Sequence, residues 1–126
     1  MIDHASIPVA DLEAGKRFYL RVLSPLGMTL LVERAGTVGF GKAYPEFWLN
    51  ARPGLAPATE TSGHHVALRA RSREAVSAFH KEALAAGGRD AGEPGDRKAA
   101  MTTYFGAFIF DLDGNKVEAL TFPPKA

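Results

Sequence analysis

The sequence predicts an α+β fold made of two similar modules, and three observations support this. Residues 63–88 align without a gap on residues 2–27 at a spacing of 61 positions, with six identities in the 26 aligned positions. Each copy reads as a strand followed by a helix, and the first copy continues into three strand-like segments. A duplicated half-domain explains the repeat and predicts two pseudo-symmetric modules. The identities are His4/His65, Glu13/Glu74, Ala14/Ala75, Phe18/Phe79, Leu23/Leu84 and Gly27/Gly88.

The first module is predicted to span residues 1–50. Residues 2–9 alternate between polar and apolar side chains, which predicts a half-buried strand with His4 on the face away from the helix. Asp11 is suited to cap the helix that follows, and Gly27 is suited to end that segment. The remaining predicted strands of this module are residues 28–33, 36–41 and 45–50.

The second module is predicted to span residues 63–122, after a Pro- and Gly-containing linker at residues 51–62. It begins with a strand at residues 64–70 and a helix capped by Ser72. The rest of the module is predicted as a polar loop at 91–100, a strand buried on both faces at 101–110, a turn at 111–115 and a closing strand at 116–122.

Length and composition narrow the classes of protein. At 126 residues the chain is expected to be one domain, residues 1–126. A net charge of +1 argues against nucleic acid as a partner, and no apolar run is long enough to predict a membrane span. The absence of targeting signals predicts a cytoplasmic location. Because the chain has no cysteine, only nitrogen and oxygen atoms are left as ligands for a metal.

The repeat singles out His4 and His65, because both stand near the start of a predicted strand. A pseudo-twofold axis would direct the two imidazoles to one place, where they could hold a metal ion. The alternative is that they only fill equivalent positions on a sheet. His64 points the opposite way from His65 in an extended strand, so only one of these neighbours can be a ligand, and the repeat selects His65.

Glu118 is the third candidate, since it stands in the predicted closing strand between Val117 and Ala119. Burying a carboxylate costs several kcal/mol unless it is paired or bound to a cation. The alternative is an exposed position at a sheet edge. Two imidazoles and one carboxylate leave coordination positions open for water or substrate, as a catalytic metal requires.

The segments 2–28, 63–88 and 104–120 resemble the vicinal oxygen chelate superfamily, which includes glyoxalase I, extradiol ring-cleaving dioxygenases and the fosfomycin and bleomycin resistance proteins. The aromatic strand, the Asp-Leu-Asp-Gly-Asn turn and the glutamate-bearing strand are the most specific part. The resemblance implies two βαβββ modules whose sheets curve around a cleft with a metal on its floor. It also implies His4, His65 and Glu118 as ligands of a divalent ion, with Fe, Mn, Zn and Ni as the candidates.

The resemblance extends to the surroundings of the metal. Glyoxalase I has a further carboxylate ligand on the last strand of its first module, where this chain has Trp48 nearby, so the three-ligand set looks like the dioxygenase and fosfomycin-resistance branches. Trp48 is expected to line the substrate or to lie in the core. Tyr104, by analogy, is expected to be a catalytic acid or hydrogen-bond donor near the substrate. Arg97 is expected either to clamp an anion at the mouth of the site or to lie in a solvated loop.

These expectations favour a metalloenzyme of lyase, isomerase or dioxygenase type that acts on a small oxygen-rich metabolite and forms a homodimer. The ion would act as a Lewis acid that stabilises an oxyanion. Two alternatives remain open. One is a non-catalytic protein that sequesters a drug or metabolite, like the bleomycin-resistance branch, and the other is a ring-cleaving dioxygenase that uses Fe(II) or Mn(II).

Overall fold

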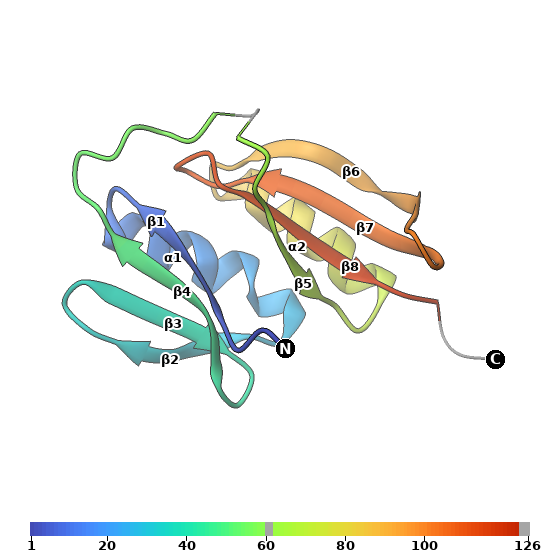
Figure 1. The fold of residues 1–126 in the computed structure, drawn as a ribbon, viewed down its shortest axis with the longest axis horizontal. Coiled ribbons are helices and arrows are strands. Elements are labelled where there is room, and N and C mark those ends of the chain that lie inside the picture. The colour runs from blue at the N-terminus through green and yellow to red at the C-terminus, as the bar shows by residue number, and fades with distance from the viewer. Residues whose placement is uncertain (60–61, 124–126) are drawn as a thin grey trace.

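Each half of the chain folds as a strand, a helix and three further strands (Figure 1). The structure is a computed structural model that describes residues 1–59 and 62–123. The first half contains β1 (Ala5–Val9), α1 (Leu12–Val22), a 3₁₀ turn η1 (Ser24–Leu26), β2 (Thr29–Glu33), β3 (Thr37–Gly41) and β4 (Pro45–Ala51). The second half contains β5 (Val66–Arg69), α2 (Arg73–Ala85), β6 (Arg89–Lys98), β7 (Thr103–Phe110) and β8 (Lys116–Thr121).

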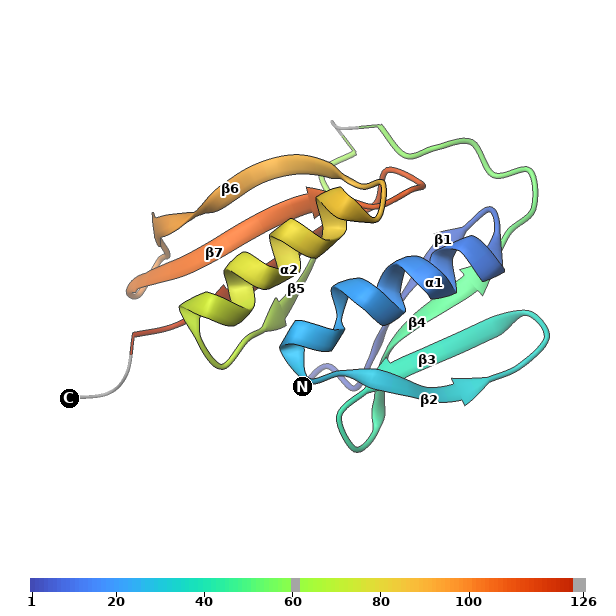
Figure 2. The ribbon, with the colours of Figure 1, turned by 180° about the vertical axis from the view of Figure 1, so that it is seen from behind.

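The strands form two four-stranded sheets with the same topology. Their orders are β1-β4-β3-β2 and β5-β8-β7-β6. In each sheet the first strand pairs in parallel with the last strand of its module, and the other pairs are antiparallel. Both helices lie on one side of the molecule (Figure 2), so neither helix covers the opposite faces of the two sheets. The predicted α+β fold of two pseudo-symmetric βαβββ modules is therefore confirmed.

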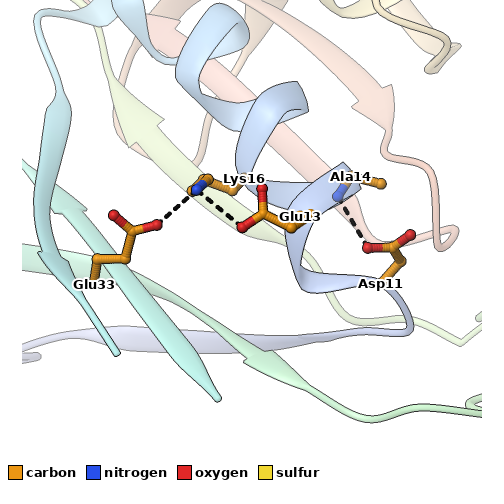
Figure 3. A network of polar contacts seen from close by, with 5 residues as sticks. All are labelled: Asp11, Glu13, Ala14, Lys16 and Glu33. Atoms are coloured by element: carbon orange, nitrogen blue, oxygen red, sulfur yellow. Dashed lines mark hydrogen bonds and ion pairs between the residues drawn. The ribbon is translucent and has the colours of Figure 1, made fainter. Parts of the chain in front are cut away.

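Both helices begin as the sequence predicts. The Asp11 carboxylate accepts a hydrogen bond from the Ala14 amide at 3.1 Å (Figure 3), and the Ser72 hydroxyl does the same for Ala75 at 3.1 Å. Each cap satisfies an amide that the first turn leaves without a partner. Figure 3 also shows Lys16 bridging Glu13 on its own helix and Glu33 at the end of β2. These ion pairs are exposed, so their contribution to stability is small.

The hydrophobic core runs through both modules. One cluster of buried side chains contains Tyr19 and Phe47 from the first module together with Val76 and Phe79 from the second. The rings of Tyr19 and Phe47 meet edge to face, with 5.1 Å between centroids. On the surface, Arg21 of α1 forms an ion pair with Glu82 of α2. The modules are thus packed against each other through the helix layer.

The turn between β7 and β8 connects the second module to the first. The buried Tyr19 hydroxyl of α1 donates to Asp111 Oδ2 at 2.6 Å. The Asn115 side chain donates to the Pro8 carbonyl at 2.9 Å, and the Ala10 amide donates to Asp113 at 3.0 Å. Burial raises the pKa of the Asp111 carboxyl and, together with Asp111, holds the pKa of Tyr19 well above its usual value. The Asp-Leu-Asp-Gly-Asn motif therefore acts as a structural joint.

Two predictions about the second module were wrong. Residues 91–100 were predicted as a polar loop, but most of them belong to β6, the edge strand next to β7. An edge strand tolerates Pro94, which has no amide to donate, and register irregularities around Gly92 accommodate the extra residues. The second concerns His80, for which helical spacing predicts a surface or boundary position beside the apolar stripe of its helix. His80 is instead buried, with only 4% of its surface exposed.

The predicted linker at residues 51–62 follows the end of β4 at Ala51. Residues 52–59 and 62 contain no helix or strand, and residues 60–61 lie outside the described part of the chain. No helix within the described ranges is long and apolar enough to cross a membrane.

Candidate functional site

Glu118 lies in the middle of a central strand. β8 pairs with β5 on one side and with β7 on the other, so the alternative of an exposed edge position is wrong. Val117 and Ala119 are fully buried in the core that α2 covers, and alternation directs Glu118 to the opposite face. Only 4% of Glu118 is exposed. A carboxylate in this position needs a partner.

His65 is the partner of one of the two Glu118 carboxylate oxygens. It directly precedes β5, and its Nε2 atom lies 3.2 Å from Glu118 Oε1. The imidazole also meets the Phe108 ring edge to face at 5.6 Å between centroids. The His65 side chain is 42% exposed, so it remains accessible to a ligand.

The second oxygen of Glu118 has no satisfactory partner. Oε2 is buried, and no donor in the described part of the chain reaches it with ordinary hydrogen-bond geometry. An unsatisfied buried acceptor costs about 1–3 kcal/mol, and more when it is charged. Such an atom indicates that something outside the described protein atoms completes the site.

Tyr104 stands beside this oxygen because Gly106 leaves room for its ring. A Cβ atom at Gly106 would lie 2.8 Å from Tyr104 Cε2 and 3.3 Å from Glu118 Oε2. Burial raises the pKa of the Tyr104 hydroxyl, and the nearby Glu118 carboxylate raises that pKa further. The hydroxyl does not reach Glu118 Oε2 with ordinary hydrogen-bond geometry. Tyr104 therefore remains protonated near neutral pH and keeps a proton to donate.

Arg97 lies on the same face, but its guanidinium is already engaged. Nη1 donates to the carbonyls of Gly95 and Gly106, and Nη2 donates to the Glu93 carbonyl. The guanidinium also lies over the Phe108 ring at 5.3 Å. In this structure Arg97 holds the irregular part of β6 against β7, and its role as a substrate clamp stays a prediction.

The first module presents Trp48 where the second presents Glu118. Ser6 pairs with Trp48 and Ala67 pairs with Glu118, and Ser6 and Ala67 are equivalent in the 61-residue repeat. The Trp48 indole packs over Gly39, where a Cβ atom would lie 2.9 Å from the ring. In glyoxalase I the last strand of the first module carries a carboxylate ligand. At the equivalent position of this chain the strand register places the indole of Trp48.

His4 lies at the same face of the first module. Its ring meets Trp48 edge to face at 6.4 Å between centroids, and its Nδ1 atom lies 2.7 Å from Asp3 Oδ2. Half of the side chain is exposed. This face offers an imidazole and an indole without a buried carboxylate.

The structure of one chain brings His65, Glu118 and Tyr104 together, but not His4. In Figures 1 and 2, β1 begins beside the N-terminus, whereas β5 begins at the opposite side of the molecule, near the segment that leads to it from β4. Among the described residues, the only group of three ligand atoms within 4.8 Å of one another is His80, Asp90 and Glu93. The His4, His65 and Glu118 ligand set therefore stays a proposal.

The His80 group has a structural explanation. His80 Nε2 lies 2.8 Å from Asp90 Oδ1, which also accepts the Gly92 amide at 2.9 Å. The hydrogen bond from His80, and then that from Gly92, lower the pKa of Asp90. His80 aligns with Tyr19 in the repeat, so both helices use this position for a buried polar side chain bonded to an aspartate. The alignment of His80 with Tyr19 therefore indicates a buried position for His80, which helical periodicity alone does not indicate.

Comparison with known proteins identifies the family. The model of the Glyoxalase/Bleomycin resistance protein/Dioxygenase superfamily matches residues 1–119. The chain belongs to this superfamily. This superfamily usually binds a divalent metal ion. No curated protein sequence matches the chain.

Solved structures of the glyoxalase superfamily have the same fold. A glyoxalase/bleomycin resistance protein from Albidiferax ferrireducens T118 has a TM-score of 0.83 and 32% identity, over 94% of this chain and 97% of that one. A glyoxalase/dioxygenase from Nostoc punctiforme has a TM-score of 0.71 and 20% identity, over 98% and 92%. A glyoxalase/bleomycin resistance protein/dioxygenase family enzyme from Burkholderia phytofirmans PsJN has a TM-score of 0.69 and 15% identity, over 97% and 98%.

Proposed function

We propose that this protein is a glyoxalase- or dioxygenase-type metalloenzyme that binds a divalent ion with His65 and Glu118 and acts on a small oxygen-rich metabolite. The observation that carries the proposal is the buried Glu118 Oε2 atom without a hydrogen-bond partner. A cation at this position would satisfy the oxygen and offset the cost of burying the carboxylate.

The donor atoms fit such an ion. Glu118 offers carboxylate oxygens and His65 offers an imidazole nitrogen 3.2 Å away. Nitrogen and oxygen ligands suit Fe, Mn, Zn and Ni, and the absence of cysteine removes the thiolate sites of softer ions. When bound, the ion would supply Lewis-acid stabilisation of an oxyanion on the substrate.

The protein's own groups would position the substrate. The Tyr104 hydroxyl, whose raised pKa keeps it protonated even in alkaline solution, would donate a hydrogen bond to a substrate oxygen near Glu118. Phe108 contacts His65 and provides an apolar wall. The Arg97 guanidinium lies over the Phe108 ring and would hold that ring in place.

His4 would come from a second copy of the chain, so that the working protein is a homodimer. Its imidazole is half exposed, and it forms no metal-binding group with His65 and Glu118 in one chain. In a twofold dimer, the first module of each copy can face the second module of its partner, and the contact is then repeated by symmetry. Trp48 would accompany His4 and form a wall against the substrate.

A mixing experiment tests both the ligand set and the dimer. We expect His4→Ala and Glu118→Gln to lack bound metal when each is purified alone. If the site spans two chains, unfolding and refolding an equal mixture will restore metal binding, because a mixed dimer contains one site with intact His4 and Glu118. The measurement is metal content by elemental analysis of the refolded dimer fraction. A refolded mixture that stays free of metal would contradict the shared site.

The narrower alternatives have no observation that favours them over this proposal. A drug-sequestering protein and a ring-cleaving dioxygenase would both be compatible with the same fold. Oxygen uptake with a catechol in the presence of Fe(II) or Mn(II) would separate the dioxygenase from the other candidates. The cytoplasmic location stays a prediction from the sequence.

A further inference from the structure

A cavity of about 270 Å³ lies at one end of the second module, and Tyr104 is among the residues that line it. It is enclosed by the start of α2, the start of β7 and the end of β8, with one residue from β6. Its size falls just below the 300–1,000 Å³ that is common for ligand pockets, so it suits a small ligand. The sequence did not predict a site at this position.

Two cationic side chains line the cavity, and they are differently engaged. Arg73 pairs with Asp96 at 3.1 Å and lies over the Phe105 ring at 5.0 Å. Arg71 has no hydrogen bond, ion pair or ring contact with any residue of the described chain. Asp96 balances one of these charges, so the cavity keeps an excess positive charge. An anionic group on the ligand would pair with the free guanidinium of Arg71.

Aromatic rings form the other walls. Phe105, Phe122 and Tyr104 line the cavity, and the rings of Tyr104 and Phe122 lie 6.2 Å apart between centroids. Arg69 lies over the outer part of this wall, 4.8 Å from the Phe122 ring centre. A planar ring can stack on these surfaces, whereas a small hydrated anion gains nothing from them.

Tyr104 connects the cavity with the proposed metal site. It lines the cavity, and its ring and Glu118 Oε2 both lie beside Gly106, where a Cβ atom would be 2.8 Å from Tyr104 Cε2 and 3.3 Å from Oε2. A ligand held in the cavity would therefore contact the side chain that lies beside the Glu118 carboxylate. This shared side chain makes the cavity a place for the distal part of a substrate.

We infer that the cavity binds the carboxylate of a small aromatic acid, with Arg71 as the anion-binding residue and Phe105 and Phe122 as ring contacts. As an assignment of substrate class, this inference rests on the proposed function. The cavity's affinity for an aromatic carboxylate does not depend on a metal.

Benzoate is the probe for this inference, with benzamide as its neutral counterpart. Benzoate titrated into the isotope-labelled full chain is expected to shift the backbone resonances of cavity residues such as Thr103 and Thr121, and to bind at least about tenfold more tightly than benzamide. Arg71→Gln is expected to weaken benzoate binding about tenfold. Arg52→Gln is the matched control, because Arg52 is exposed, lies outside the cavity lining, and its side chain bonds only to the adjacent Ala51 carbonyl among the described residues.

The outcomes separate this inference from the proposed function. Equal binding of benzoate and benzamide, unchanged binding in Arg71→Gln, or the absence of shifts in the cavity at millimolar benzoate would overturn it. Inorganic phosphate binding as tightly as benzoate would show an anion site without the aromatic selectivity, and would also overturn it. The Glu118→Gln variant is expected to lose metal and keep benzoate binding. Metal retained in that variant would count against the proposed function only.

Discussion

Replacing His65 by alanine will lower the affinity of the protein for its divalent ion by at least about 100-fold. Loss of a residue that only orients a metal ligand already costs about 10–100-fold, so loss of a ligand should cost no less. His65 is only 3.2 Å from Glu118, and no other histidine in the described chain contacts that carboxylate. Affinity is measured by calorimetric titration of the metal into protein that has been stripped with a chelator.

His64→Ala provides a matched control for this prediction. His64 is adjacent in sequence and also exposed, but its ring lies 2.8 Å from the Ser62 hydroxyl and makes no contact with Glu118. We expect its metal affinity to equal that of the unmodified chain. Equal losses in the two variants, or no loss in either, would contradict the assignment of His65.

Replacing Tyr19 by phenylalanine will lower the free energy of unfolding by about 1.5–3 kcal/mol, the usual contribution of a hydrogen bond to a charged group. The Tyr19 hydroxyl is fully buried and donates to Asp111 at 2.6 Å. The variant leaves a buried carboxylate that has lost one donor. The measurement is equilibrium urea unfolding near neutral pH, where the midpoint should fall without a change in slope.

This destabilisation should shrink in acid. The Tyr19 hydrogen bond lowers the pKa of Asp111, although burial keeps that pKa above its ordinary value of 3.8. Without the hydroxyl the pKa rises further, so acid stabilises the variant relative to the unmodified chain as the pH falls through the native pKa of Asp111. An undiminished difference below pH 3.8 would contradict this explanation.

Tyr44→Phe is the control for the buried tyrosine. Its hydroxyl also donates to an aspartate, Asp3, at 3.0 Å, but the pair is exposed. We expect a change within about 0.5 kcal/mol, as for most surface substitutions. A similar loss in both variants would show that the effect does not come from the joint between the modules.

Most of the fold could be predicted because the repeat and the local signals agree. The alignment of His4 with His65 set the register of the two modules, and the caps Asp11 and Ser72 fixed the starts of both helices. β6 could not be predicted in the same way. Its glycines, Pro94 and charged residues are typical of a loop, and only pairing with the aromatic β7 makes them a strand.

The candidate site could be predicted in part for similar reasons. Glu118 was found because a carboxylate in an apolar strand needs an explanation, and its burial agrees with that argument. The equivalence of Trp48 and Glu118 follows from strand register, because they pair with Ser6 and Ala67, which are equivalent in the repeat. Arg71 and its cavity could not be found, because the cavity is formed by segments that are far apart in the sequence, at the start of α2, the start of β7 and the end of β8. The burial of His80 depends on its contact with Asp90, which helical periodicity does not encode.

The most direct measurement of the central claim is anomalous X-ray scattering from crystals of protein purified without chelator. The metal proposal predicts an anomalous peak bound to Glu118 Oε2 and to His65, and the absorption edge of that peak would identify the element. A difference map with only a water molecule or a protein donor at Oε2, in protein supplied with Fe, Mn, Zn and Ni, would contradict the proposal.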